Sequence, residues 1–423
     1  MKRFNFRKLI HLQPHSNRSL QKHWNAVQIG LFLLPFSSFL GGVPILVVSL
    51  ALWKQHFFKL SHDRINQGFA LLSILMMITA CFGIDRTNAF LGLFNFLPFF
   101  IAFPALSFLI QTPAQLRRIA WILVLTSIPV SLIGFGQLYL NWGGYPSVLW
   151  GLLQWTIDPG GTPPGRMASI FTYANVLAAY YAIVFVLGVG LWIEYPRSRL
   201  LAVAILLDGI ALILTNSRNV WAIALLACLA FALYQGWNRI VAIVGGIGAI
   251  MISAAFAPMP IANLFRIVVP RFFWARLNDQ LYSDRPVAQL RSTQWKFAWS
   301  MAHDRPFTGW GLRSFTQLYL AKMNYWLGHP HNLFLMMSAE TGFIVTALLY
   351  GLVGWIMAQG VLRCRIQPNR IYFTFLIAFA ACTLFSFLDV TLFDARTNLI
   401  GWIVLAGIWG IAKNKTERSF SPS

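Results

Sequence analysis

Three residues in an otherwise apolar chain have side chains suited to phosphate and proton chemistry. Arg218 stands between two apolar stretches, Arg291 begins the helical spacing Arg291-x3-Trp295-x3-Trp299, and His331 follows Gly328-His329-Pro330. A guanidinium offers phosphate a permanently charged, bidentate contact. An imidazole titrates near neutral pH and can accept a proton from a hydroxyl group. These residues predict an anion-binding site with a general base.

Each of these residues also has an ordinary structural interpretation. An Arg at a membrane boundary can extend to the lipid headgroups, and a lone His at a helix start often caps or packs. His329 is an alternative base, although Pro330 is expected to redirect it. The chemical interpretation therefore requires the segments to meet in the fold.

Polar residues gather at three expected helix starts, in segments 169–175, 215–219 and 329–332. Each helix start should present free backbone N–H groups and the positive end of the helix dipole to one outer surface, which attracts anions. Ser217 or Asn216, and Asn332, are also plausible N-caps, which is the alternative for each segment taken alone. Convergence of the three starts near one basic loop favours an anion site.

The composition predicts a membrane protein of the all-α, polytopic class. The 423 residues are 57% hydrophobic and only 11% charged, whereas a soluble domain has about 25% charged residues. The apolar runs are continuous, which disfavours a β-barrel, and about 20 apolar residues cross a bilayer. We expect about twelve spans in one integral membrane domain covering residues 1–423, at roughly 27–40, 42–53, 66–83, 88–111, 117–140, 171–194, 199–215, 219–236, 239–258, 332–360, 370–388 and 396–412.

The distribution of the 33 Lys and Arg residues predicts the orientation. Gly41-Gly42-Val43-Pro44 is a turn signal between the first two runs, which form either a tight hairpin or one kinked long helix. If they are two crossings, 20 of the 33 fall on one side. That side carries both termini and, by the positive-inside rule, is cytoplasmic. The first apolar run lacks a clear cleavage site and is expected to be a retained anchor.

Residues 259–331 are predicted to form a large extracytoplasmic loop that carries nine Lys or Arg residues against three Asp. Its cations alternate with aromatic residues, which suits a helical segment lying in the membrane interface. Simple packing onto headgroups, without chemistry, is the alternative. A basic surface on the outer side is unusual, and an anionic, lipid-linked substrate explains it. Binding of nucleic acid is not expected, since there is no soluble basic domain.

Other polar groups add little chemistry. The four cysteines lie in or beside apolar runs without a CxxC or His/Cys cluster, so neither a disulfide framework nor a zinc site is indicated. Asp208, inside an expected span, either pairs with a neighbouring helix or serves a transport path. Glu340 lies nine residues beyond His331 and is not expected to reach the same proton.

The chain resembles the O-antigen ligase/polymerase family of bacterial membrane glycosyltransferases over roughly residues 160–345. The resemblance rests on ordered segments that the chain shares with the family: Ser169-Ile-Phe-Thr-Tyr-Ala-Asn175, Leu214-Thr-Asn-Ser-Arg218, Arg291-x3-Trp295, Asp304-Arg-Pro-Phe-Thr-Gly-Trp-Gly311, His331-Asn-Leu-Phe-Leu335 and Ala339-Glu-Thr-Gly342. Two departures concern the shape of the donor site: Thr172-Tyr173-Ala174-Asn175 replaces a Gly-Asn-Pro-Asn turn, and Asn219-Val220 replaces small residues.

The resemblance implies roles for particular residues. It implies that Arg218 and Arg291 hold the pyrophosphate of a polyprenyl-linked glycan and that His331 is the catalytic base. Further substrate contacts are expected from the polar residues around them, Asn175, Ser217, His329, Arg313 and Asn332. No metal and no cofactor are expected, since the arginines would take the place of a metal and the outer loops lack an obvious carboxylate cluster.

The sequence thus predicts an inverting glycan transferase in the bacterial cytoplasmic membrane, with its active site facing the periplasm. The expected donor is a glycan on undecaprenyl pyrophosphate, and the acceptor is a hydroxyl of a lipid, protein or glycan among the membrane lipids. Three alternatives remain: a polymerase of the same family, a membrane transporter of the inorganic-carbon type, and a non-catalytic scaffold for polysaccharide export.

Overall fold

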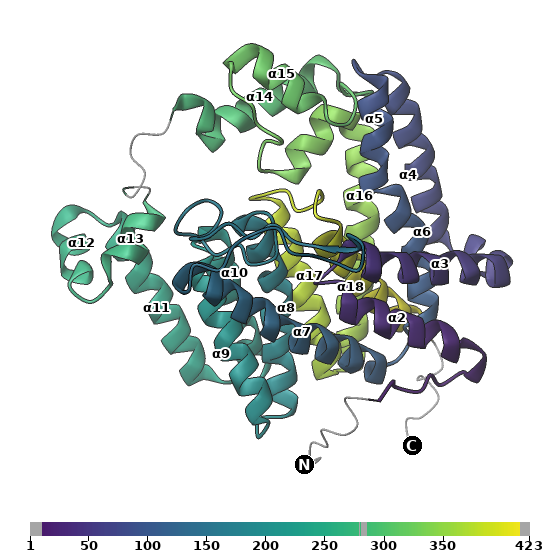
Figure 1. Cartoon of the computed structure of the whole chain (residues 1–423), viewed down its shortest axis with the longest axis horizontal. Coiled ribbons are helices and arrows are strands. Elements are labelled where there is room, and N and C mark those ends of the chain that lie inside the picture. Colours follow the sequence, from purple (N-terminus) through teal and green to yellow (C-terminus); the bar gives the residue numbers. More distant parts are fainter. Residues whose placement is uncertain (1–10, 279, 281–285, 415–423) are drawn as a thin grey trace.

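The structure is a computed structural model that describes residues 11–278, 280 and 286–414. It is almost entirely helical (Figure 1). The elements are η1 (Arg18–Leu20), α2 (Gln21–Leu33), α3 (Ser38–Ser61), α4 (Arg64–Cys81), α5 (Arg86–Gly92), η2 (Leu93–Asn95), α6 (Leu97–Leu109), α7 (Pro113–Tyr139), β1 (Ser147–Val148), β2 (Leu153–Gln154), α8 (Ala174–Glu194), α9 (Arg199–Leu214), α10 (Arg218–Tyr234), α11 (Asn238–Phe256), α12 (Met259–Arg266), α13 (Arg271–Leu277), η4 (Val287–Gln289), α14 (Arg291–Asp304), α15 (Ser314–Met323), α16 (Leu333–Ile366), α17 (Arg370–Ser386) and α18 (Ala395–Lys413).

Several charges that entered the sequence predictions lie outside the described residues. They are Lys2, Arg3, Arg7, Lys8, Lys415 and Arg418 of the termini, and Asp279, Asp284 and Arg285 of the large loop.

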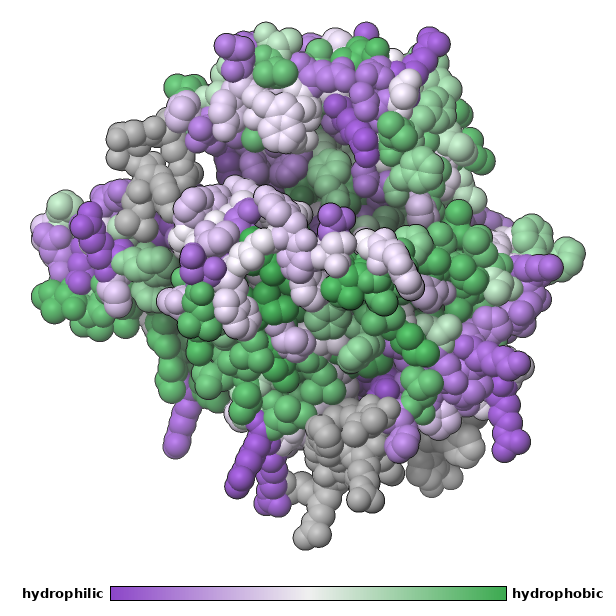
Figure 2. Space-filling view, viewed as in Figure 1, coloured by the Kyte–Doolittle hydropathy of each residue, from purple (hydrophilic) through white to green (hydrophobic). Residues whose placement is uncertain are grey.

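The part of the chain that the structure describes contains eight helices long and apolar enough to cross a membrane, and α10 and α17 are shorter apolar helices. Figure 2 shows hydrophobic side chains across the middle of the molecule and hydrophilic ones toward its upper and lower ends. The predicted class, an all-α multi-pass membrane protein, is therefore confirmed. The count of twelve spans and the boundaries of the outer loop stay predictions.

The two ends of the described chain lie on the same side of the bundle, called here the terminal side. His15 Nε2 lies 3.0 Å from the Leu109 carbonyl, and Asn414 Nδ2 donates to the Gln111 carbonyl at 3.4 Å. Helix α7 starts beside these contacts and is 27 residues long, or about 40 Å at 1.5 Å per residue. Residues after Tyr139 and the starts of α8 and α10 therefore lie on the opposite side.

The break between the first two apolar helices differs from the predicted position. Gly41-Gly42-Val43-Pro44 lies inside α3, and the chain turns at residues 34–37 instead. Ser37 begins α3, and its side chain accepts the Leu40 N–H at 3.2 Å. A Cβ added to Gly41 would lie 2.3 Å from Leu34 Cα. The glycine is needed for close packing of the two helix ends, and the turn prediction was wrong.

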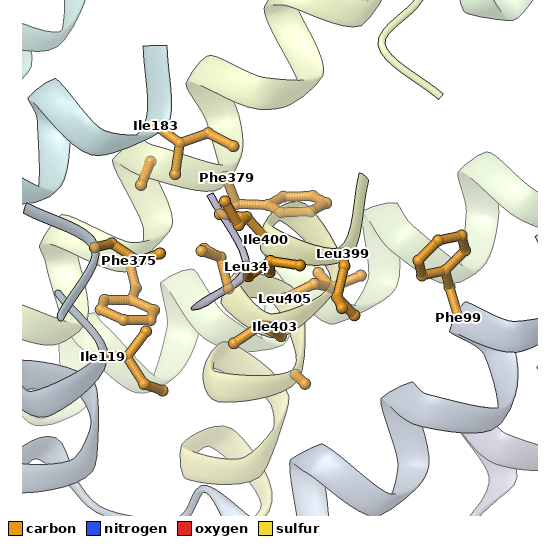
Figure 3. Close-up of a cluster of buried hydrophobic side chains, with 14 of the residues drawn as sticks. Leu34, Phe99, Ile119, Ile183, Phe375, Phe379, Leu399, Ile400, Ile403 and Leu405 are labelled. Atoms are coloured by element: carbon orange, nitrogen blue, oxygen red, sulfur yellow. The ribbon is translucent and has the colours of Figure 1, made fainter. Parts of the chain in front are cut away.

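The core of the bundle is formed by α7, α8 and α18, whose apolar windows are 67–72% buried, against 17% for α11. Figure 3 shows Ile119 of α7, Ile183 of α8, Phe375 of α17 and Ile400 of α18 among the buried side chains. Aliphatic and aromatic side chains fill this centre, so it provides a fixed support for the helix starts on the opposite side.

Asp208 is a buried carboxylate on α9. Its two oxygens accept hydrogen bonds from Ser127 Oγ at 2.8 Å and Ser131 Oγ at 3.1 Å, both on α7. Ser131 also bonds the Tyr181 hydroxyl at 2.7 Å. The carboxylate thus links α9 to α7, which fits the expected pairing with a neighbouring helix.

The segment after α7 includes a small hairpin in which β1 and β2 pair antiparallel. Ser37 Oγ donates to the Leu152 carbonyl at 2.7 Å, and Trp155 Nε1 donates to the Phe36 carbonyl at 2.7 Å. These bonds fix the hairpin over the turn between α2 and α3, and the chain then returns to the start of α8.

Helices α14 and α15 dock on the first part of α16, on the upper side in Figure 1. Gly342 interrupts α16 with φ 81°, and a Cβ added to Gly309 would lie 2.3 Å from the Glu340 carbonyl carbon. The Glu340 carboxylate accepts the Phe315 N–H at 3.1 Å in the first turn of α15. Glu340 thus fixes the outer helices, which fits the expectation that it does not act on the same proton as His331.

The close packing at Gly41 yields a stability prediction. Gly41→Ala should lower the free energy of unfolding by about 1–3 kcal/mol, because the new methyl group would overlap backbone atoms of Leu34. Gly42→Ala is the matched control: its nearest neighbour would be Leu399 Cδ2 at 3.9 Å, and alanine favours helix. Thermal unfolding in detergent measures both, and equal melting temperatures would contradict the packing assignment.

Candidate active site

A cavity of about 680 Å³ opens on the side opposite the terminal side, and such a volume suits a small ligand or headgroup. Figure 2 shows the surface hollowed between the upper helices α14 and α15 and the segments below them. The cavity walls come from the loop before α8, the starts of α8, α10 and α14, α13, η4 and the segment before α16. The lining residues are Pro163, Pro164, Arg166, Tyr173, Asn175, Ser217, Arg218, Asn219, Arg276, Gln289, Leu290, Arg291, Gln294, Tyr325, Leu327 and His331.

Four arginines line this cavity, and no Asp or Glu is among its described lining residues. Arg166 and Arg276 are only 8% and 6% exposed, whereas Arg218 and Arg291 are half-buried. Like charges in a concave, partly desolvated site focus a positive potential. The cavity is therefore built to receive an anion.

Arg218 and Arg276 connect the start of α10 with α13 through hydrogen bonds to neutral oxygens. Arg218 Nη1 donates to the carbonyls of Arg276 at 3.4 Å and Leu277 at 3.2 Å. Arg276 Nε donates to Asn216, 2.9 Å from Oδ1 and 3.2 Å from the carbonyl oxygen. These acceptors are neutral, and they orient the two guanidiniums at the cavity wall.

Arg291 is the first residue of α14 and reaches the start of α10 on the facing wall. Its Nη1 donates to Asn219 Oδ1 at 3.4 Å, and Asn219 Nδ2 donates to the Leu388 carbonyl at 3.1 Å. An outer helix is thereby connected to the bundle beside the cavity. Arg291 and Arg218 face one compartment, although 73 positions separate them in the sequence.

His331 precedes the N-cap of α16 in a left-handed conformation, with φ 53°. Few non-glycine residues adopt this region, and they gather at sites where the surroundings fix them. Its Nδ1 lies 2.8 Å from Asp389 Oδ1. A carboxylate can only accept, so Nδ1 carries the hydrogen and Nε2 is left with the lone pair. This tautomer is the one that can take a proton from a substrate.

Asp389, in the connection between α17 and α18, is 4% exposed and has donors on both oxygens. Oδ1 accepts the Val390 N–H at 2.8 Å as well as His331, and Oδ2 accepts Asn175 Nδ2. Burial alone would raise the pKa of Asp389. The charge and hydrogen bond of His331, with the charges of His329 and Arg291, outweigh burial and lower it below its usual range.

His329 completes this group, with Nε2 3.9 Å from Asp389 Oδ1 and its ring stacked on Phe393. Burial lowers the pKa of His329 to about 4, against the opposing charge of Asp389. His329, His331 and Asp389 offer ligand atoms within 4.8 Å of one another. Both oxygens of the carboxylate already accept hydrogen bonds, and the adjoining wall is cationic. We therefore interpret the group as a hydrogen-bonded acid–base cluster.

The structure brings five of the eight residues singled out in the sequence to the cavity wall, namely Asn175, Ser217, Arg218, Arg291 and His331. His329 lines a smaller adjoining pocket of about 50 Å³, together with Asp389. Arg313 and Asn332 do not line either space. Arg313 is the left-handed N-cap residue of α15, and Asn332 caps α16 by accepting the Leu335 N–H at 2.9 Å.

Sequence reasoning missed Asp389, Arg166 and the cavity-facing role of Arg276. Asp389 had one available signal: it is among only twelve acidic residues and follows an expected span on the outer side. Arg166 follows a Gly/Pro-rich stretch, and in such a loop its sequence context does not distinguish it from an ordinary surface cation. Nothing local distinguishes Arg276 from the other cations of the large loop.

Residues 201–350 match the family model described as O-Antigen ligase. The matched range includes Arg218, Arg291 and His331 but not Arg166, Asn175 or Asp389. The match supports the O-antigen ligase family and confirms the resemblance drawn from the sequence. The search of curated proteins found none that matches this chain.

The low pKa values of His329 and Asp389 predict how stability depends on pH. In the folded state both groups bind fewer protons than in the unfolded chain, so stability rises with pH between the two pKa values of each group. For His329 this range runs from about 4 to 6.5, and stability should fall as the pH drops through it. In His329→Gln this part of the dependence should disappear, whereas the part due to Asp389, at lower pH, remains.

Melting temperatures between pH 7.5 and 4.5 in detergent measure this effect. His62→Gln changes an exposed histidine outside the cluster and should keep the wild-type slope. A His329→Gln variant with the wild-type slope would show that His329 is not held neutral by its surroundings.

Proposed function

We propose that this chain, with its O-antigen ligase match over residues 201–350, is a metal-independent, inverting glycan transferase. It would move a glycan from undecaprenyl pyrophosphate to an acceptor hydroxyl at the periplasmic face of the bacterial cytoplasmic membrane. One observation carries the proposal: Arg218, Arg291 and His331 line the same cavity, and the imidazole is backed by a carboxylate.

The arginines would act on the leaving group. When the glycosidic bond breaks, negative charge develops on the departing pyrophosphate, and donors already oriented toward it stabilise that charge without reorganising. Arg218 and Arg291 lie on facing walls and are held by neutral acceptors. Both guanidiniums are therefore placed to form charge-assisted hydrogen bonds with the diphosphate.

His331 would act on the acceptor. Its Nε2 takes the hydroxyl proton as the acceptor oxygen forms its bond to the anomeric carbon, and Asp389 stabilises the resulting imidazolium. The bond to the pyrophosphate oxygen breaks in the same displacement, and its electron pair leaves with the pyrophosphate.

Inversion follows from this single displacement. A retaining enzyme needs a second carboxylate near the sugar to form a covalent intermediate. No Asp or Glu is among the described residues lining the cavity, and both oxygens of Asp389 are occupied behind His331. This arrangement supports one step at the anomeric carbon.

A polymerase of the same family would use the same site and differ only in its acceptor, which would be a second lipid-linked glycan. A transporter would instead need polar groups near the middle of the bilayer. Asp208 has a donor from α7 on each oxygen and is packed in the core, which favours a structural role for it.

The test is transfer from a purified polyprenyl pyrophosphate glycan to defined lipid, protein and glycan acceptors, with and without a chelator. Wild-type protein should transfer equally in both conditions. His331→Ala should slow transfer by about 10²–10⁴-fold, since it removes the base. Unchanged transfer by His331→Ala would exclude that role, and loss of transfer with chelator would refute metal independence.

Arg218→Lys tests the phosphate clamp separately. Lysine keeps the charge but lacks the planar fork that binds phosphate bidentately, so transfer should fall about tenfold or more, the effect of losing roughly 1.4 kcal/mol of stabilisation. Arg305→Lys is the control: Arg305 packs over Trp310 outside the cavity lining and should keep wild-type transfer. Full activity in Arg218→Lys would contradict the clamp assignment.

A further inference from the structure

A continuous series of side-chain hydrogen bonds runs from the cavity wall to the base. Arg166 Nη2 donates to Asn175 Oδ1, Asn175 Nδ2 donates to Asp389 Oδ2, and Asp389 Oδ1 accepts His331 Nδ1 at 2.8 Å. Arg166 and Asn175 lie before and at the start of α8, His331 lies before α16, and Asp389 lies between α17 and α18. Arg166 and His331 both line the main cavity. The series therefore connects these two lining residues through Asp389, which lies behind the cavity wall.

We propose that Arg166 and Asn175 are positioning residues: they hold the second oxygen of Asp389 and thereby set the orientation and proton affinity of His331. This inference rests on the proposed function for the role of His331 as a base. It assigns Asn175 a place behind the base, in contrast to the substrate contact expected from the sequence.

Asn175 fits this position because its two ends have opposite polarity. An arginine side chain can only donate hydrogen bonds, and a carboxylate can only accept them. An amide with its oxygen toward Arg166 and its nitrogen toward Asp389 satisfies both neighbours. The amide orientation therefore follows from its two partners, and neither Ala, Asp nor Leu at this position would bridge them.

Arg166 is in turn fixed to the bundle. Its Nε donates to the Thr215 carbonyl at 2.8 Å, at the end of α9, and the side chain is only 8% exposed. A second connection reaches the same Asp389 loop from the other wall, where Asn219 bonds both Arg291 and the Leu388 carbonyl. Both walls of the anion site thus support the loop that holds the carboxylate.

The direction of the effect on His331 follows from the charges around it. The groups near the ring are Asp389 and His329, with Arg291 and, through Asn175, Arg166; Arg218 and Arg276 lie across the same cavity. Removing the amide donor leaves Asp389 Oδ2 with one hydrogen bond fewer and makes the carboxylate a stronger partner for an imidazolium. Removing Arg166 takes away a positive charge. Both changes should increase the proton affinity of His331.

The experiment titrates His331 directly by NMR, using protein with ¹³C-labelled histidine in lipid nanodiscs, and the His331→Gln variant assigns its resonance. Asn175→Ala and Arg166→Gln should each raise the His331 proton affinity about three- to tenfold, a shift of about 0.5–1 pH unit. The acidic limb of the pH profile for kcat/KM should move upward by the same amount. Asn175→Leu, which also lacks the donor, serves if the alanine variant does not fold.

Asn66→Ala is the matched control, because Asn66 is a buried asparagine whose Nδ2 bonds the Leu60 carbonyl far from the cavity. It should lower stability and leave the titration unchanged. If His331 titrates alike in wild type, Asn175→Ala and Arg166→Gln, the positioning role is overturned. If the shifts appear but wild-type protein transfers no polyprenyl pyrophosphate glycan, the proposed function fails while the positioning role stands.

Discussion

The structure depends on a charge constraint: four arginines share one cavity without a carboxylate among its described lining residues. A buried cation needs hydrogen-bond acceptors, and in most proteins Asp or Glu supplies them. Here main-chain carbonyls at helix ends do so, from Thr215 and Asn216 after α9 and from Arg276 and Leu277 of α13. These acceptors hold the guanidiniums in place without adding a negative charge of their own. The fold must therefore bring several helix ends to one place.

The single carboxylate of the cluster is used differently. Asp389 lies behind His331 rather than in the cavity, and it has donors on both oxygens. It can stabilise an imidazolium without competing with a phosphate for the arginines. Acid–base chemistry and anion binding thereby use different residues of one site. Asn175 and Asn219 connect the two parts because their amides accept on one side and donate on the other.

Much of the fold and part of the site could be predicted from the sequence. Long apolar runs determine helices because a bilayer requires internally bonded backbone, and Arg218 and His331 were recognisable since each precedes such a run. Gly41-Gly42 was misread because a glycine needed for helix packing resembles a glycine needed for a turn. Asp389 was missed because its partner lies 58 residues away. Arg313 and Asn332 lie at helix starts outside the cavity lining, and polarity at a helix start does not distinguish a cap from a ligand.

The use of main-chain acceptors has a consequence for how this site changes over generations. A carbonyl oxygen is present whatever side chain a codon specifies, so substitutions at Thr215 or Leu277 leave the acceptor for the arginine in place. Only changes that unwind the helix end remove it. The side chains at these two positions are thus free to change, whereas Asn216 and Asn219, which accept through their side chains, are not.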